Sequence, residues 1–219
     1  ESLLERYKVN LLVDNSKQKG APMVYETSPS YYNLFGSIEY RQEMGYWMTD
    51  LNYIQAGSVL KANGGFLVVQ ANDILTIPYV WDRIKRTLKS RQYVIENLDE
   101  QLKVIPTTTL KPQPIPIDLK VIIIGSSEIY SVLYAYDEDF RKYFKVRSHF
   151  DDEMERNEET ELLYASFIAT QCQRYNPDVN FERKAISRII EYGSRIIENQ
   201  KKLTTQFNLI ADVVSESIY

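Results

Sequence analysis

The spacing of apolar residues changes once along this chain, near His149. Before His149, short apolar runs are separated by turn-rich segments, a pattern typical of buried strands that alternate with helices. After His149, apolar residues recur at helical spacing and mark one face of each segment. We therefore expect an α/β domain at residues 1–149 and a small all-α domain at residues 150–219.

The first part contains candidate strands on both sides of a clear helix. Trp81, Ile84 and Leu88 recur at helical spacing within 78–89, which predicts a strand, helix, strand unit around them. The segment 106–116 holds four prolines and is expected to be an extended surface connection, because proline donates no ladder hydrogen bond. The candidate strands are Val9–Val13, Phe66–Val69, Tyr93–Glu96 and Val121–Ile124.

The second part is expected to form three helices. The first would begin in the acidic run 151–155, because carboxylates are favoured in the first turn of a helix. The second is expected from about Phe181, and the third from Thr204 or Thr205, either of which is a suitable N-cap.

Composition excludes several classes of protein. With 26 basic and 30 acidic residues the net charge is -4, so no broad positive field attracts nucleic acid or an anionic membrane. No apolar run approaches the roughly 20 residues that span a bilayer. The chain opens at Glu1 without a methionine and stops at Tyr219 within an amphipathic segment, so we expect it to be part of a longer protein.

Self-contained catalytic sets are missing from the sequence. The single cysteine, Cys172, cannot form an intramolecular disulfide or a thiolate cluster, which fits a cytoplasmic protein, and it is expected to be a buried small hydrophobe. The single histidine, His149, is expected to be structural, since a histidine metal cluster or a serine triad needs partners this chain lacks. There is also no G-x-x-x-x-G-K-[ST] phosphate loop. We assign no catalytic residue and no metal ligand.

Several local strings nevertheless resemble one family, the ATPase module of Lon-like proteases. The resemblance is to the archaeal or B-type branch and its relatives, including the C-type branch with degraded ATPase motifs, and it runs across essentially the whole chain. It implies an AAA+-like partial α/β nucleotide-binding domain followed by a helical lid. The strings that carry it are Val9–Ser16, Gly20–Pro22, Asn33–Gly36, Ala56–Gly57, Leu60–Gly65 and Pro114–Asp118.

The resemblance also implies where nucleotide chemistry would lie. In active members the strand matching 66–69 ends in Asp-Glu, where the aspartate holds magnesium and the glutamate orients water. This chain has Gln70 and Ala71 there, a poor magnesium ligand and a side chain that cannot polarise water. After the strand 121–124, Ser126 matches the polar residue that senses the terminal phosphate and could still form a hydrogen bond.

Two further positions depart from the family pattern. An arginine that reaches a neighbouring subunit's nucleotide is expected near Tyr143, and Arg141 lies two residues earlier. The lid arginine is replaced by Gln206. A tyrosine or glutamine cannot neutralise phosphate charge as a guanidinium does. These losses together predict a degenerate ATPase. The family's phosphate loop lies upstream of this fragment, and the ATP and Mg²⁺ expected for the family are predicted to bind the fragment weakly or not at all.

An aromatic segment before the acidic-strand position indicates a different activity. By resemblance, an aromatic loop there grips substrate in the axial pore of AAA+ unfoldases. The alternative is that these side chains pack onto the fold or onto an adjacent subunit. The pore-loop candidates are Tyr40, Met44, Tyr46, Trp47 and Met48, in a segment expected to be a loop.

The resemblance therefore predicts a module that forms a homo-oligomeric ring and engages unfolded or damaged protein. It would pass that protein to a downstream Ser-Lys peptidase domain outside this chain. The alternative from another class is a nonenzymatic AAA+-like scaffold for oligomerisation or adaptor binding. No nucleic-acid partner is expected.

Overall fold

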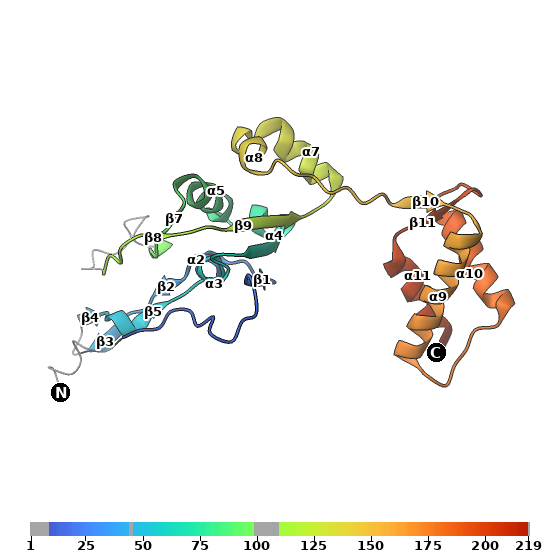
Figure 1. Cartoon of the computed structure of the whole chain (residues 1–219), viewed down its shortest axis with the longest axis horizontal. Coiled ribbons are helices and arrows are strands. Elements are labelled where there is room, and N and C mark those ends of the chain that lie inside the picture. Colours follow the sequence, from blue (N-terminus) through green and yellow to red (C-terminus); the bar gives the residue numbers. More distant parts are fainter. Residues whose placement is uncertain (1–8, 44–45, 99–109, 219) are drawn as a thin grey trace. The chain divides into compact units, whose positions relative to one another are not determined.

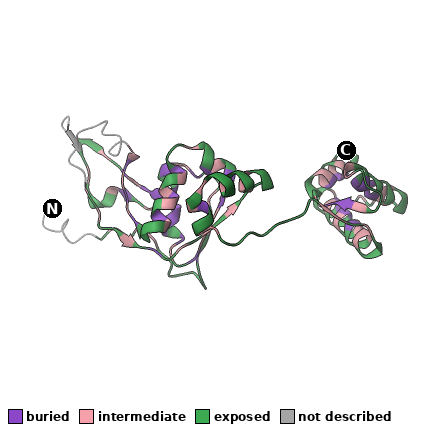
Figure 2. Cartoon of the chain, turned by 90° about the horizontal axis from the view of Figure 1, so that it is seen from above, coloured by how far each residue is buried: buried purple, intermediate pink, exposed green. Residues whose placement is uncertain are grey.

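The computed structural model describes residues 9–43, 46–98 and 110–218, and it leaves the side chains of residues 43, 46 and 47 undescribed. Contacts divide the chain into two compact units, Glu1–Lys145 and Val146–Tyr219 (Figure 1). Each unit has its own hydrophobic core, seen as separate groups of buried residues in Figure 2. The division after Lys145 differs slightly from the boundary expected after His149.

A parallel three-stranded sheet with the order β1, β6, β9 forms the centre of the first unit. The strands span Met23–Tyr25 (β1), Phe66–Gln70 (β6) and Lys120–Ile124 (β9). The sequence predicted β6 and β9 but missed β1. It also placed a strand at 9–13, which is wrong, because the structure has no strand there.

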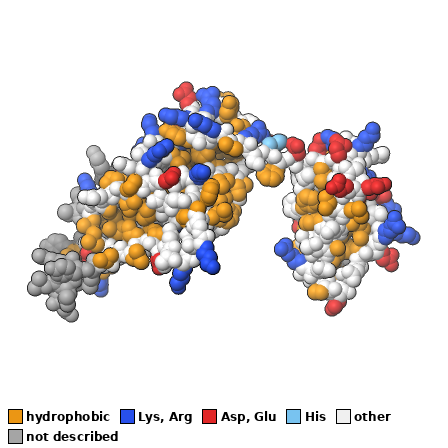
Figure 3. Space-filling model, in the orientation of Figure 1, with side chains coloured by type: hydrophobic (Ala, Val, Ile, Leu, Met, Phe, Trp, Pro, Cys, Tyr) orange, Lys and Arg blue, Asp and Glu red, His pale blue; other side chains and the backbone are white. Residues whose placement is uncertain are grey.

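The two faces of this sheet differ in burial. Leu67 and Val69 of β6 are fully buried against the helices, as expected for a central strand. Met23, Tyr25, Ile122 and Ile124 are exposed on the opposite face, since residues two apart along a strand share a face. Hydrophobic side chains accordingly cover much of the first unit in Figure 3.

Four helices pack around the core of this unit. The helix predicted at 78–89 is confirmed as α5, while α4 follows β6 directly. Leu34, Val59, Ile74 and Ile84 each contribute a buried side chain from one of these helices. The helices are α2 (Tyr31–Phe35), α3 (Ser58–Lys61), α4 (Ala71–Thr76) and α5 (Val80–Ser90).

Residues 37–43 and 46–55 form the two sides of an antiparallel hairpin that we call the arm. Strand β2 pairs with β5 near the body of the unit, and β3 pairs with β4 farther out (Figure 1). The expectation of a loop at 40–50 is therefore wrong, because most of that segment is paired backbone. The arm contains β2 (Ser37–Ile38), β3 (Arg41–Glu43), β4 (Tyr46–Met48), the 3-10 helix η1 (Leu51–Tyr53) and β5 (Ile54–Gln55).

The predicted strand at 93–96 shortens to β7 (Gln92–Tyr93), which pairs antiparallel with β8 (Ile115–Pro116). It does not join the central sheet, so the predicted strand, helix, strand unit is wrong. The physical reason is that β7 pairs with β8 instead, and that Asn97, just after the predicted strand, makes two hydrogen bonds to the backbone of Ile38 in the arm. The proline-rich connection lies partly outside the described residues; its described part, 110–116, is irregular until β8.

Asp137 fixes the last two helices of the unit, α7 (Ser127–Tyr136) and α8 (Glu138–Tyr143), onto α5. Its Oδ2 accepts hydrogen bonds from Trp81 Nε1 at 2.8 Å and from Lys85 Nζ at 2.9 Å. Its Oδ1 accepts the Phe140 N–H at 3.1 Å and so caps α8. Burial disfavours the carboxylate, but these hydrogen bonds outweigh it and hold the pKa of Asp137 below its ordinary value.

The second unit is a helical lid, as predicted, with a two-stranded antiparallel sheet that the sequence did not reveal. The acidic residues at 153–155 belong to that sheet and not to a helix, whose first acidic residue is Glu158. The third helix begins at Phe207, slightly after the predicted Thr204 or Thr205. The elements are β10 (Glu153–Glu155), α9 (Glu158–Tyr175), α10 (Arg183–Ile196), β11 (Lys202–Thr204) and α11 (Phe207–Ile218).

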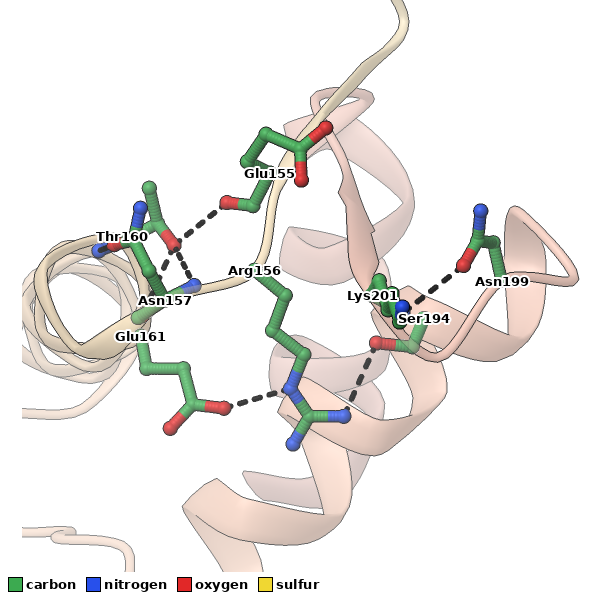
Figure 4. A network of polar contacts seen from close by, with 8 residues as sticks. All are labelled: Glu155, Arg156, Asn157, Thr160, Glu161, Ser194, Asn199 and Lys201. Carbon is green, nitrogen blue, oxygen red and sulfur yellow. Dashed lines mark hydrogen bonds and ion pairs between the residues drawn. The ribbon is translucent and has the colours of Figure 1, made fainter.

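Arg156 ties the start of α9 to the end of α10 (Figure 4). Its Nε donates to Glu161 at 2.6 Å, one terminal nitrogen donates to Ser194 at 3.4 Å, and its backbone N–H donates to the Lys201 carbonyl. Tyr164 adds a buried hydroxyl that donates to the Thr204 carbonyl at 2.8 Å. Arg156 thus joins two helices of the lid, and Tyr164 joins α9 to the small sheet.

Cys172 is buried in the core of the lid, as predicted, and burial raises the pKa of its thiol. His149 is half exposed and pairs with Asp151 at 2.9 Å, so it has a partner without being a core residue. No helix among the described residues is long and apolar enough to cross a membrane.

The Asp137 contacts generate a stability prediction. Asp137→Asn should lower the free energy of unfolding of the first unit by about 1–3 kcal/mol at pH 7, because it leaves the half-buried Lys85 without its closest carboxylate. A carboxyl whose pKa is lowered on folding stabilises the fold above its unfolded pKa, and that contribution is lost as pH falls through its folded pKa. The difference between wild type and variant should therefore be constant near neutral pH and shrink below about pH 4. Urea unfolding followed by Trp81 fluorescence in a Trp47→Phe background measures it.

Asp82→Asn is the matched control. Asp82 also pairs with Lys85, at 3.2 Å, but its side chain is 67% exposed, so its loss should cost less than about 1 kcal/mol. Equal costs for the two variants, or a difference at Asp137 that is unchanged by acid, would contradict the assignment.

Candidate functional site

Three of the positions that the resemblance assigns to nucleotide chemistry, Gln70, Ala71 and Ser126, lie at the carboxyl ends of β6 and β9. Gln70 ends β6 and pairs in register with Ile124 of β9, and Ala71 opens α4. A Cβ placed on Gly125 would lie 2.7 Å from the Cβ of Ala71, so the two chain segments touch directly after their strands. In open α/β sheets, ligands bind outside the carboxyl ends of parallel strands. These residues therefore lie at the edge of the sheet where such folds bind ligands.

The side chains at this location do not fit a magnesium ion. Gln70 points to the exposed face of the sheet, where its Nε2 donates to the Tyr25 hydroxyl at 3.1 Å. Ala71 is buried and carries no polar atom. Asp73, the acidic residue in the first turn of α4, lies beyond the strand end. Magnesium needs carboxylate oxygens in near-octahedral geometry, and this strand end offers an amide and a methyl group instead.

Ser126 lies beside these residues as the N-cap of α7. Its hydroxyl oxygen accepts the Ile129 N–H at 3.3 Å, and the side chain is exposed. A hydroxyl that accepts one bond still has a hydrogen to donate. Ser126 can therefore serve as both a helix cap and a polar contact for a ligand.

One carboxylate at this edge of the sheet escaped the sequence interpretation. Glu26 follows β1, its backbone N–H donates to the Val68 carbonyl at 3.0 Å, and its carboxylate accepts bonds from the Ser28 N–H and the Ser58 hydroxyl. These hydrogen bonds hold α3 against the turn that follows β1. Recognising Met23–Tyr25 as a strand would have placed Glu26 at this edge.

Arg141 and Tyr143 lie on α8, in the same unit but on a different element. Arg141 is exposed, with its guanidinium carbon 5.8 Å from the centre of the Tyr134 ring. Tyr143 is half buried, and the Lys142 ammonium lies 5.5 Å from its ring centre. Gln206 belongs to the lid, where it is exposed just before α11. The structure thus joins Gln70, Ala71 and Ser126, while Gln206 lies in a separate unit.

The pore-loop candidates lie on the arm. Tyr40 is half buried next to β3, and Met48 at the end of β4 is 56% exposed. Tyr46 and Trp47 belong to β4 by their backbone, their side chains are not described, and Met44 lies outside the described residues. Leu51, also 56% exposed, was missed by the sequence reading and adds apolar surface to the arm.

The base of the arm is a close crossing of two glycines. A Cβ on Gly57 would lie 2.2 Å from the Leu34 carbonyl oxygen, and one on Gly36 would lie 2.2 Å from the Gln55 carbonyl oxygen. Gly36 also has a φ of 74°, a conformation that favours glycine. Side chains other than hydrogen would force the two ends of the arm apart.

Tyr93 bridges this crossing. Its buried hydroxyl donates to the Phe35 carbonyl at 2.7 Å and accepts the Gly57 N–H at 3.1 Å. Burial raises the pKa of Tyr93 to about 12, so the hydroxyl keeps the proton that the bond to Phe35 needs. The two ends of the arm are therefore joined through one side chain.

Comparison with solved structures shows a related fold. NtrX from Brucella abortus aligns with a TM-score of 0.55 at 12% identity, covering 90% of this chain and 40% of that chain. NtrX in complex with ADP aligns with a TM-score of 0.54 at 14% identity, covering 89% and 38%. The chain thus spans about two fifths of these structures' length, and at this identity the likeness shows the fold alone. Comparison with curated proteins gave no match.

Family models identify the chain more closely. Residues 19–151 match the LonB-like AAA domain, and residues 180–219 match the archaeal LonB AAA+ ATPase lid domain. The first match covers the central sheet and the arm, and the second covers α10, β11 and α11. By sequence and by fold, this chain belongs to the LonB-like AAA domain family, as an AAA+ module of a Lon-like protease.

Proposed function

We propose that this chain is a degenerate ATPase module that engages unfolded or damaged polypeptide on behalf of a Ser-Lys peptidase domain elsewhere in its parent protein. The observation that carries the proposal is the contrast between two parts of one unit. The arm is firmly anchored by Tyr93 and exposes apolar residues, whereas the strand end at Gln70 and Ala71 lacks the groups for hydrolysis.

The nucleotide part of the proposal rests on separate losses. Phosphoryl transfer needs a phosphate loop, a metal carboxylate and a residue that orients water. In the family the phosphate loop lies upstream of the part matched here, so the proposal rests on the other two groups, which Gln70 and Ala71 replace. Family membership implies nucleotide and Mg²⁺ use in general, so the proposal is that this copy of the module has lost it.

The arm part rests on surface chemistry. Met48, the last residue of β4, and Leu51 expose apolar area, and β4 also carries Tyr46 and Trp47. Apolar and aromatic contacts bind many sequences, because they require neither a particular charge nor a particular hydrogen-bond pattern. Such a surface suits a module that must engage unfolded chains of any sequence.

The proposal also includes an assembly and a location. AAA+ domains commonly form oligomeric rings, and we place this module in a homo-oligomeric ring in the cytoplasm. Its net charge of -4 favours protein over nucleic-acid partners.

A nonenzymatic scaffold is the second candidate function. The close approach of Gly125 to Ala71 favours it, because the segments that follow β6 and β9 pack against each other at the strand ends. The two functions differ in one property: only the first requires the arm to bind unfolded polypeptide.

We predict that the isolated chain neither binds Mg-ATP tightly nor hydrolyses it. The reason is the missing phosphate loop together with Gln70 and Ala71. Isothermal calorimetry with Mg-ATP and a phosphate-release assay measure both properties. A micromolar Kd, equivalent to about 8 kcal/mol of binding free energy, would show that another phosphate site exists.

We predict that changing Tyr46 and Trp47 together to alanine in the parent protein slows degradation of an unfolded protein about tenfold or more. Loss of two aromatic anchors typically costs more than 1 kcal/mol each. Cleavage of a short peptide, which needs no arm, should be nearly unchanged. Paired protein and peptide assays on the same preparation measure the difference.

Tyr175→Ala, which removes a 51% exposed tyrosine at the end of α9, is the control and should affect neither assay. Loss of assembly in the arm variant would favour the packing role of these aromatics. Normal protein degradation with intact assembly would eliminate the arm as the substrate contact.

A further inference from the structure

The first strand of the arm has an edge that faces away from its partner strand. Glu39 N–H donates to the Tyr53 carbonyl at 2.9 Å, so the residues beside Ile38 point their backbone groups toward the other strand of the hairpin. In an antiparallel pair, residues that bond to the partner strand alternate with residues whose backbone groups point away from it. The backbone N–H and C=O of Ile38 therefore point outward. Ile38 is only 2% exposed, so water does not satisfy these groups.

Asn97 satisfies both of them. Its Oδ1 accepts the Ile38 N–H at 2.9 Å, and its Nδ2 donates to the Ile38 carbonyl at 2.7 Å. The side-chain amide thus occupies the place of a neighbouring strand's peptide group. Asn97 is itself 6% exposed, so these two hydrogen bonds are shielded from competing water.

The same segment holds the arm at its base. Tyr93 lies in β7, shortly before Asn97, and its hydroxyl joins the Phe35 carbonyl to the Gly57 N–H. Phe35 precedes the first strand of the arm and Gly57 follows its last strand. Residues 93–97 therefore contact the arm at its entry, at its exit and along the outer edge of β2. Contacts at separate places fix a direction as well as a position.

We propose that Asn97 is a positioning residue for substrate engagement, which sets the direction of the arm by completing the edge of β2 at Ile38. This inference rests on the proposed function, in that the arm must bind unfolded polypeptide. Asn97 does not touch the polypeptide; it acts through β2 and the hairpin that continues from it.

Asn97→Asp is the sharpest variant, because it preserves the shape of the side chain. The carboxylate still accepts the Ile38 N–H, but its second oxygen faces the Ile38 carbonyl oxygen in place of a donor. Removing one partner of a buried hydrogen bond leaves the other group unsatisfied. The edge of β2 should then separate from residue 97, while Tyr93 still joins the ends of the arm.

Asn63→Asp is a matched control within the same unit. Asn63 Nδ2 donates to the Pro116 carbonyl at 3.2 Å, and its Oδ1 accepts the Asp118 N–H at 2.9 Å. These are the same two kinds of bond, but they tie α3 to the segment before β9 and do not touch the arm. A general loss of stability would therefore affect both variants, whereas a loss of arm direction would affect only one.

The experiment uses the full-length parent protein with three measurements. Hydrogen exchange reports on the Ile38 amide, fluorescence anisotropy reports on binding of labelled, reduced and carboxymethylated α-lactalbumin, and a thermal melt reports on stability. Asn97→Asp should accelerate Ile38 exchange and weaken polypeptide binding, each about tenfold, which corresponds to about 1.4 kcal/mol. Asn63→Asp should leave both unchanged, even where its melting temperature falls equally.

Each other outcome overturns the inference. Faster exchange with unchanged binding would show that arm direction does not matter, while the proposed function would stand. Equal binding losses in both variants would reduce Asn97 to a stability role. Failure of the wild-type protein to bind the polypeptide would refute the proposed function and this inference together.

Asn97→Ser provides a second variant if Asn97→Asp does not fold. The serine is too short to form both bonds to Ile38 but introduces no charge. It should again weaken polypeptide binding, and a folded Asn97→Ser protein with wild-type binding would overturn the inference.

Discussion

The crossing of Gly36 and Gly57 under the Tyr93 hydroxyl is the constraint on which the first unit depends. The chain leaves the core after α2, runs through the arm and returns to α3. The outgoing segment at Gly36 and the returning segment at Gly57 are in direct backbone contact. Only hydrogen side chains permit that approach, and the neutral Tyr93 hydroxyl donates to one segment while it accepts from the other. The arm is consequently an extension of the core and not a loop attached to it.

This anchoring is separate from the strand end at which we propose that nucleotide chemistry has been lost. The residues at the end of β6 interact with Tyr25 and Gly125, whereas the residues that hold the arm belong to α2, α3 and the segment 93–97. Under the proposed function, Gln70 and Ala71 replace the acidic pair without touching the second set, so the arm is retained although the hydrolytic groups are lost.

Sequence patterns predicted those elements in which apolar residues form a continuous run or recur at helical spacing. β6, β9, α5 and the helical lid were all found in this way. β1 escaped because it has three residues and a face of exposed apolar side chains, and the acidic strand β10 was read as a helix start because strand pairing with Lys202–Thr204 is nonlocal. At the candidate site, Gln70, Ala71 and Ser126 came from family resemblance. Tyr93 and Asn97 could not be found, since their roles depend on backbone groups nearly 60 positions away.

The central claim is that the arm meets unfolded polypeptide, and site-specific photocrosslinking tests it most directly. A benzophenone side chain would replace exposed Met48 on the arm or, as a control, Leu162 on the lid, which is 71% exposed. In the full-length protein, labelled unfolded polypeptide should crosslink at position 48 and be displaced by unlabelled unfolded protein, with little adduct at position 162. Equal yields at the two positions, or no adduct at position 48, would contradict the account.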